Sequence, residues 1–389
     1  MPVKSLRFLL PGGGIMKLSR RSEEIKISGI RRVFELGATI KDPIDLSIGQ
    51  PDFSIPEIAA IEGKKALDEG FTRYTLTQGI QPLRDKVNEY YKKTHGVSFE
   101  ECFITCGVAG GIITSFFSVL EEGDEVLLPD PVFMIYEQWV RFLGGKVVRY
   151  DTYPDFKAYP DRVEKLITPK TKIMMIVSPS NPTGVVFEDS DVRKLANIAK
   201  KHNLLVISDE IYDRFCYDSE PTTVAKYYDN VLVMGGFSKF AGMPGMRLGY
   251  ALGNKDLIMA MRKIQQFSFV CAPSVSQRIG VVVMDYDFGP TRDRYREKRD
   301  MLYNGLKDRF EITKPNGAFY AFPRVPWGDS TSFCETAIKH KVLIIPGSEF
   351  SLRNSHFRIS FATSNDKLAK GIEILNYLAD NPPEEFAGK

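Results

Sequence analysis

The chain has 389 residues, a length that can bury a large core and favours two domains over one. Its content of 43% hydrophobic and 26% charged residues is ordinary for a globular protein, and the formal net charge is only +3. Such a small charge gives no support to nucleic-acid binding or to an anionic membrane surface, and no apolar run reaches the length of a membrane span.

The cysteines indicate a reducing compartment, and neither the cysteines nor the histidines indicate a metal site. The five cysteines are scattered and odd in number, which is typical of a reducing compartment and not of a disulfide framework. Neither they nor the four histidines have metal-site spacing, so we expect no metal. Residues 1–15 contain an apolar run too short for a signal peptide, and we expect a disordered extension there, with Met16 as a candidate start. A cytoplasmic protein is therefore predicted.

The N-terminal part predicts helices and one short strand. An amphipathic helix is expected over Ser22–Leu36 and a strand over Ile44–Ile48. Two further helices are expected over Ile58–Glu69 and Leu83–Thr94, with a glycine-containing loop over 73–79 between them.

From residue 103 onward, candidate strands alternate with helices. The strands are Phe103–Cys106, Glu125–Leu128, Lys146–Tyr150, Lys172–Val177, Leu204–Ser208, Val231–Met234 and Leu248–Leu252. This alternation predicts an α/β fold with a mostly parallel seven-stranded sheet flanked by helices. Ligands of such sheets bind beyond the carboxyl ends of the strands, so polar residues at those ends are candidates for a site.

The last hundred residues have a different pattern. A charged helix over Thr291–Leu306 begins a second unit, in which strands and two helices mix as in α+β proteins. We therefore predict an N-terminal arm over 16–47 that joins the small domain, a large domain over 48–288 and a small α+β domain over 289–389.

The stretch Gly236–Tyr250 is the most informative one for chemistry. It follows an apolar strand and has four glycines and one proline in fifteen residues, too many for a regular helix. It contains two cations, Lys239 and Arg247. A partly desolvated lysine near another cation can lose its proton near neutral pH and condense with a carbonyl. Taken alone, however, the stretch fits a surface loop with two solvated cations equally well.

Polar residues earlier in the chain favour a reactive site over a solvated surface loop. Asp209 ends an apolar strand, where a carboxylate is costly to bury without a cationic partner. A protonated ring nitrogen is such a partner, although a helix N-cap is the structural alternative. Tyr212, three residues later, faces the same way on a helical turn and can donate to a phenolic oxygen. Asn181 lies in a turn-forming sequence after another strand.

Three further positions suit a phosphate and a flat ring. Gly107 leads into a helix whose free N–H groups suit a phosphate, and Arg247 can add a bidentate contact. Phe133 can stack on a ring, although a buried aromatic is more often part of the core. Together these residues suit an aldehyde cofactor that carries a phosphate and a ring nitrogen.

In their order along the chain, these motifs resemble the fold-type-I aminotransferases that use pyridoxal 5′-phosphate, most closely the branch of bacterial and archaeal aspartate and aromatic aminotransferases. The resemblance covers about Ser22 to Leu378. It implies that Lys239 binds the cofactor aldehyde and then moves a proton between the substrate Cα and the cofactor carbon. It further implies that Asp209 pairs with the pyridine nitrogen, that Tyr212 and Asn181 bond the phenolic oxygen, and that Phe133 stacks on the ring.

The resemblance also implies contacts to the phosphate, the substrate and a second subunit. The residues it places on the phosphate are Val108, Ala109, Ser238 and Arg247. Tyr74 resembles the family's tyrosine that reaches the phosphate of the partner subunit, which implies a homodimer with shared sites. Arg358 matches the arginine that clamps the substrate α-carboxylate, and Gly49 and Asn181 lie beside it. The region 48–288 is then the cofactor-binding domain.

Two positions depart from the family pattern. Gly236 stands where many members have a hydroxyl residue on the phosphate, and Ala109 stands where one subgroup has a lysine that binds the side chain of aspartate. Arg31 or Arg32 could supply a replacement cation, but neighbouring helical residues point in different directions. The expected activity is transfer of an amino group from an L-amino acid (aspartate, aromatic or medium apolar) to a 2-oxo acid, with 2-oxoglutarate as the expected acceptor.

Two other functions remain open. A β-lyase or decarboxylase uses the same cofactor, and Arg358 does not distinguish it from an aminotransferase. A non-catalytic cofactor-binding regulator is less favoured, because such proteins usually carry a fused DNA-binding domain and we see no room for one before Ser22.

Overall fold

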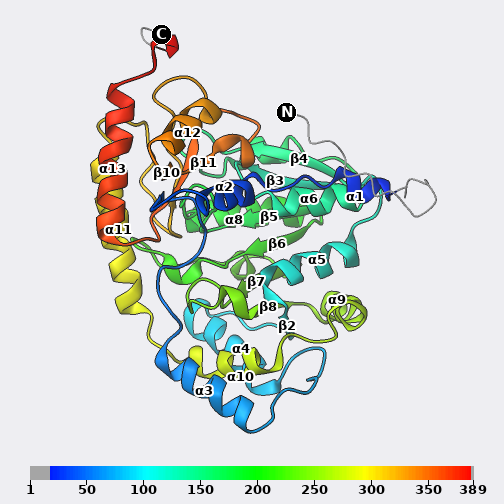
Figure 1. Ribbon diagram of the computed structural model, residues 1–389. Helices are drawn as coiled ribbons and strands as arrows, with labels where there is room; N and C mark the ends of the chain where they lie inside the picture. The colour runs from blue at the N-terminus through cyan, green and yellow to red at the C-terminus, as the bar shows by residue number, and fades with distance from the viewer. Residues whose placement is uncertain (1–17, 387–389) are drawn as a thin grey trace, which may run out of the picture.

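A seven-stranded sheet forms the centre of the molecule in the computed structural model, which describes residues 18–386 (Figure 1). The strand order is β2-β8-β7-β6-β5-β3-β4. The pairs from β7 to β4 are parallel, whereas β8 runs antiparallel to both β2 and β7. The bounds are β2 (Glu101–Thr105), β3 (Glu125–Asp130), β4 (Lys146–Asp151), β5 (Thr171–Val177), β6 (Leu205–Asp209), β7 (Val231–Gly236) and β8 (Gly249–Gly253). The predicted α/β fold with a mostly parallel seven-stranded sheet is confirmed; the extension predicted over residues 1–15 lies outside the described residues.

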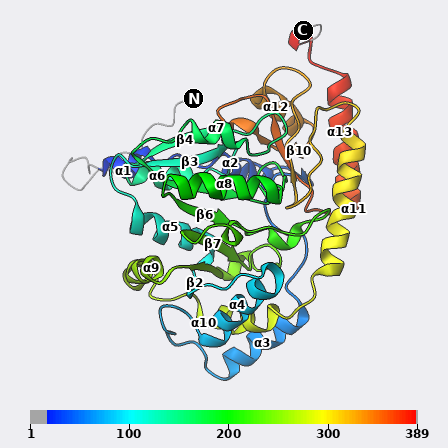
Figure 2. The same cartoon turned by 180° about the vertical axis from the view of Figure 1, so that it is seen from behind.

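Both faces of the sheet are buried, which is why its strands are nearly continuous apolar runs. Successive side chains of a strand point to opposite faces, so Val206 of β6 packs into one core and Ile207 into the other. The helices α5 (Gly107–Val119), α6 (Ile135–Phe142) and α9 (Lys255–Ser268) cover the Ile207 face, and α4 (Gln81–His95), α8 (Asp189–Lys201) and α10 (Ser274–Val283) contribute to the Val206 core (Figure 2). Among residues 18–386, no helix is long and apolar enough to cross a membrane.

Two small sheets join the ends of the chain. The short strand β1 (Ile44–Asp45) pairs in parallel with β10 (Val342–Leu343), and β12 (Phe357–Ser360) lies between β11 (Ile345–Pro346) and β9 (Tyr320–Ala321). The long helices α11 (Gly289–Leu306) and α13 (Asn365–Asp380) lie side by side in both views, near α12 (Ser330–Lys339) (Figures 1 and 2). The N-terminal segment is thereby attached to the C-terminal part, while the predicted domain boundaries stay a prediction.

Two expectations about the N-terminal elements were wrong. The single helix expected over Ser22–Leu36 is two helices, α1 (Arg20–Glu24) and α2 (Gly29–Gly37), because Ser28 is extended and its side chain caps α2 by accepting from the Arg31 amide. The strand expected over Ile44–Ile48 ends at Asp45, since the Asp45 carboxylate accepts from the Ser47 amide at 2.9 Å and turns the chain. The next two predicted helices match α3 (Glu57–Asp68) and α4 within two residues at each end.

The carboxyl ends of the parallel strands meet at one edge of the sheet. Asp209 is the last residue of β6, Lys239 follows β7, Asn181 follows β5 and Phe133 follows β3. The antiparallel β8 brings its amino end to the same edge, so Arg247 also arrives there. The topology therefore collects residues from five strands at one place.

Candidate active site

A cavity of about 360 Å³ lies at this edge of the sheet. Every residue predicted to bind cofactor or substrate lines it, except Tyr74. The predicted residues found there are Gly49, Val108, Ala109, Phe133, Asn181, Asp209, Tyr212, Ser238, Lys239, Arg247 and Arg358. The structure therefore brings these residues together at one cavity, and their individual roles stay predictions.

Lys239 presents an amine whose charged form is disfavoured. Its side chain is partly buried, and Nζ donates a hydrogen bond to the Gly49 carbonyl at 2.6 Å. Burial, together with the cations Arg358 and Arg247, lowers the pKa of Lys239 to about 8, and Asp209 opposes this shift. A lysine with such a pKa supplies a neutral amine at mildly alkaline pH, which is the form that attacks a carbonyl.

Asp209 is buried between two hydrogen-bond donors. Its Oδ2 accepts from the Tyr136 hydroxyl at 2.7 Å and its Oδ1 from the Ile211 amide at 3.1 Å. Burial raises the pKa of Asp209, while the bonds from Tyr136 and Ile211 act in the opposite direction. Each carboxylate oxygen can accept a further bond, so Asp209 can receive an N–H donor from the cavity that it lines.

Tyr212 is paired with a second tyrosine from a distant part of the chain. Its hydroxyl lies 2.9 Å from that of Tyr320 on β9, and burial raises the pKa of Tyr212 well above its ordinary value, so it remains a phenol. A Cβ at Gly49 would lie 2.4 Å from the Tyr320 hydroxyl, so only glycine permits this close approach. Tyr212 and Tyr320 therefore form a fixed pair in the cavity wall.

Arg358 on β12 is almost fully buried, with 1% exposure. It donates to Asn181 Oδ1 at 2.9 Å and to the Ser47 carbonyl at 2.5 Å, and its guanidinium lies over the rings of Tyr320 and Phe350. Within residues 18–386 its Nε has no partner, and each Nη carries a second hydrogen. Donors therefore remain for a planar carboxylate.

The start of α5 forms a cradle for an anion. The helix begins at Gly107 without a capping side chain, so its first amides are free to bind a ligand. Gly107 has φ +71°, and a Cβ there would lie 2.6 Å from Arg247 Nη2. The guanidinium of Arg247 therefore lies against the first turn of α5, and Ser238 lines the same cavity. A helix N-terminus and a guanidinium together favour a phosphate group.

The charges around the cavity fit a polyanionic ligand. Three cations line it, Lys239, Arg247 and Arg358, against the single carboxylate of Asp209 among the described lining residues. A ligand with a phosphate near Arg247, an aldehyde near Lys239 and a ring N–H near Asp209 satisfies this arrangement. These residues therefore fit pyridoxal 5′-phosphate.

Some residues of the site could not be found from the sequence. Tyr136 and Tyr320 line the cavity and contact Asp209 and Tyr212, but an isolated tyrosine in a helix or strand is indistinguishable from a core residue. Ile30 on α2 also lines the cavity. Its neighbours Arg31 and Arg32, considered as side-chain-selecting cations, are exposed and do not line it, and Arg31 pairs with Glu35 at 3.2 Å.

Tyr74 lies apart from this group. It is 82% exposed, on the loop between α3 and α4, and does not line the cavity of its own chain.

Comparisons with known proteins agree on one family. The family profile described as aminotransferase class I and II matches residues 41–375. A probable aspartate aminotransferase of Methanocaldococcus jannaschii is 36% identical over 371 residues, which cover 92% of this chain and 98% of the relative. The aromatic-amino-acid aminotransferase 2 of Thermococcus litoralis is 34% identical, with 92% of this chain and 97% of the relative covered. The solved structure of aspartate aminotransferase from Thermus thermophilus with maleate has a TM-score of 0.89 and 32% identity, and covers 92% of this chain and 98% of that chain.

Proposed function

The chain belongs to the class I and II aminotransferases, and we propose that it uses pyridoxal 5′-phosphate to transfer the amino group of an aromatic or medium apolar L-amino acid, or of aspartate, to a 2-oxo acid such as 2-oxoglutarate. One observation carries the cofactor assignment. Lys239, with its pKa lowered to about 8, and the buried Asp209 reach the same cavity from the ends of the adjacent strands β7 and β6.

The residues that would hold the cofactor come from separate elements. The phosphate would lie on the Val108 and Ala109 amides at the start of α5, with Ser238 and Arg247. Asp209 would accept from the ring nitrogen, Tyr212 and Asn181 would bond the phenolic oxygen, and Phe133 would contact the ring face. When bound, the cofactor supplies an aldehyde that takes up the amino group and a conjugated ring that withdraws electrons from the substrate Cα.

The chain's own residues then orient the substrate and move a proton. Arg358 holds the α-carboxylate in a planar fork and so fixes which bond at Cα faces the cofactor. The Lys239 amine, whose charged form burial disfavours, accepts the proton from Cα as a general base. Asp209 retains the positive charge on the ring nitrogen, since a buried carboxylate is stabilised by a cationic partner.

The cavity favours apolar substrate side chains. Ile30, Ile135, Phe133 and Ala109 line it, and among the described lining residues the three cations already have roles. Discrimination between apolar side chains amounts to only about 1–3 kcal/mol per methylene. We therefore expect a permissive enzyme that accepts several aromatic and apolar amino acids.

The test is incubation of the holoenzyme with one L-amino acid and no acceptor, using aspartate, alanine, tyrosine, phenylalanine and leucine in turn. An aminotransferase releases one 2-oxo acid per subunit and stops, and 2-oxoglutarate restarts it. Continuous release of product without an acceptor would show a lyase instead. A preference for aspartate of about a thousandfold over all the other amino acids, equivalent to about 4 kcal/mol, exceeds the roughly 1–3 kcal/mol of an apolar pocket and would contradict the proposed substrate range.

A homodimer in the cytoplasm is the proposed state of the protein. Exposed apolar side chains support an interface, among them Ile61 at 58%, Leu76 at 69% and Phe267 at 90% exposure. The exposed Tyr74 would then reach the phosphate in the partner's cavity. The cytoplasm is supported by the five cysteines, which are all free thiols.

A further inference from the structure

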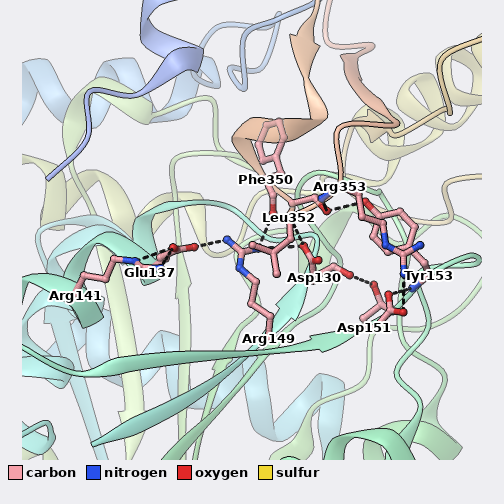
Figure 3. Close-up of polar contacts among 11 residues, drawn as sticks. Asp130, Glu137, Arg141, Arg149, Asp151, Tyr153, Phe350, Leu352 and Arg353 are labelled. Atoms are coloured by element: carbon pink, nitrogen blue, oxygen red, sulfur yellow. Dashed lines mark hydrogen bonds and ion pairs between the residues drawn. The ribbon is translucent and has the colours of Figure 1, made fainter. Parts of the chain in front are cut away.

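Arg149 on β4 is the centre of a largely buried polar network outside the cavity (Figure 3). Its side chain is 11% exposed, and its Nη1 donates to Asp130 Oδ1 at 3.1 Å and to the Phe350 carbonyl at 2.9 Å. Its Nη2 donates to Glu137. One guanidinium therefore joins two carboxylates and a backbone carbonyl. The fixed directions of its N–H groups allow this, whereas the single charged nitrogen of a lysine cannot reach all three acceptors.

The network holds two segments that are far apart in the sequence. One is the loop after β3, which leads from Asp130 to Phe133. The other is the 347–352 segment, which comprises the short helix η4 (Gly347–Glu349) and the three residues after it. Besides the Arg149 contacts, the Val132 amide donates to the Phe350 carbonyl at 2.9 Å and the Leu352 amide to Asp130 Oδ1 at 3.3 Å.

The 347–352 segment also contacts two walls of the cavity. The ring of Phe350 lies 4.9 Å from the guanidinium carbon of Arg358 and is 1% exposed. Glu349 accepts from the Gly29 amide at 2.9 Å, at the start of the helix α2 that carries Ile30. A shift of this segment therefore alters the support of Arg358 and the position of the apolar wall together, because a packed interior transmits small displacements.

We propose that Arg149 is a positioning residue for substrate binding: by holding the 347–352 segment against the loop after β3, it fixes Phe350 under Arg358 and so orients that guanidinium for the substrate carboxylate. Arg149 does not line the cavity and acts through Phe350. Without it, Asp130 and Glu137 lose their shared cation and the Phe350 carbonyl loses a charge-assisted donor. The inference rests on the proposed role of Arg358.

The test measures binding of a carboxylate that cannot react. The probe is hydrocinnamate, an apolar carboxylate without an amino group, titrated into the holoenzymes of wild type, Arg149→Lys, Arg149→Met and Phe350→Leu. Coupling through a packed neighbour is worth about 0.5–2 kcal/mol, so we expect the dissociation constant to rise about two- to thirtyfold in all three variants. The KM for amino acids should rise with it, by a larger factor than any change in kcat or in the affinity for the cofactor.

Arg141→Met is the matched control. Arg141 also donates to Glu137, at 2.8 Å, but is 56% exposed and has no bond to the 347–352 segment, so we expect its dissociation constant for hydrocinnamate to match the wild type. Phe350→Leu keeps the Arg149 network but removes the aromatic ring. It therefore tests the support of Arg358 by Phe350 even if Arg149→Met does not fold.

Arg358→Lys separates the two possible failures. If Arg358→Lys binds hydrocinnamate more weakly but the Arg149 and Phe350 variants bind it as the wild type does, the positioning role of Arg149 is wrong and the proposed role of Arg358 stands. This holds even if the Arg149 and Phe350 variants have lower melting temperatures. Unchanged binding in Arg358→Lys would overturn both the proposed role of Arg358 and the inference that depends on it.

Discussion

At Lys239, the surroundings rather than the residue type lower the pKa of the amine. Burial and the cations Arg358 and Arg247 each disfavour the ammonium form, and Asp209 only partly opposes them. The lysine was recognisable from the glycine-rich stretch around it, but its pKa depends on Arg358, which is more than a hundred residues away in the sequence. This electrostatic effect arises because β12 and the segment after β7 bring the two cations to one cavity.

The lowered pKa predicts a pH-dependent stability of the cofactor-free protein. Between about 8 and the ordinary value of 10.5, the unfolded chain binds the Lys239 proton and the folded chain does not. The free energy of unfolding of the wild type should therefore rise with pH across this range relative to Lys239→Met, because the cost of burying the charged amine is present below pH 8 and disappears above 10.5. Urea unfolding of both proteins at several pH values measures it. A difference that stays constant with pH would contradict the lowered pKa.

Asp209 gives the second prediction at this scale. Removing one partner of a buried ion pair costs roughly 3–5 kcal/mol, so Asp209→Ala should lose most of its cofactor affinity and turn over far more slowly than Asp209→Glu. Tyr136→Phe is the control, since it removes one hydrogen bond to the carboxylate, worth about 1.5–3 kcal/mol, and keeps the charge. Cofactor titration and kcat/KM measure both effects; near-wild-type values for Asp209→Ala and Asp209→Glu alike would refute a ring nitrogen as the partner.

Among the elements, the buried strands could be predicted from the sequence, whereas helix ends that depend on a side-chain contact could not. Strands covered on both faces are continuous apolar runs, so their number and order along the chain could be read directly. The break between α1 and α2 depends on whether Ser28 serves as a helix interior residue or as a cap, and the periodicity of the sequence is the same in both cases. Tyr136 and Tyr320 bond to residues far away in the sequence, so no local sequence pattern predicts these contacts.

The start of α5 gives a prediction for an element. A Cβ at Gly249 would lie 2.6 Å from the Gly107 carbonyl carbon and 2.8 Å from the Val108 nitrogen, both backbone atoms that cannot rotate away. Gly249→Ala should therefore displace the first turn of α5, weaken cofactor binding and lower the melting temperature, as overpacking costs about 1–3 kcal/mol. Gly245→Ala is the control four residues earlier in the chain: a Cβ there meets no atom of residues 18–386 within 4 Å, so this variant should bind cofactor normally. Equal cofactor affinities in the two variants would argue against the cradle.

For the whole molecule, the position of Tyr74 bears on the proposed dimer. Its hydroxyl cannot serve its own cavity, because the residue is 82% exposed and does not line it. The same region of the chain exposes Ile58, Ile61, Leu67 and Leu76. Large exposed apolar groups of this kind mark interaction surfaces, which is consistent with a dimer in which each subunit completes the site of the other.

Hybrid dimers test this arrangement. Lys239→Ala and Tyr74→Ala should each have low activity alone. In a mixed dimer, one of the two sites combines the intact Lys239 of one subunit with the intact Tyr74 of the other, so dissociating and reassociating the two variants together should restore activity above that of either. No gain on mixing, in a sample shown by mass to contain mixed dimers, would mean that Tyr74 does not act across the interface.

The covalent position of the cofactor is the most direct test of the whole account. The holoenzyme is reduced with borohydride, digested, and its peptides are mapped by mass spectrometry. We predict that the reduced cofactor is found on Lys239 and that Lys239→Ala carries no label at any position. Attachment to a different lysine, or no attachment in an enzyme that still transaminates, would contradict the central assignment.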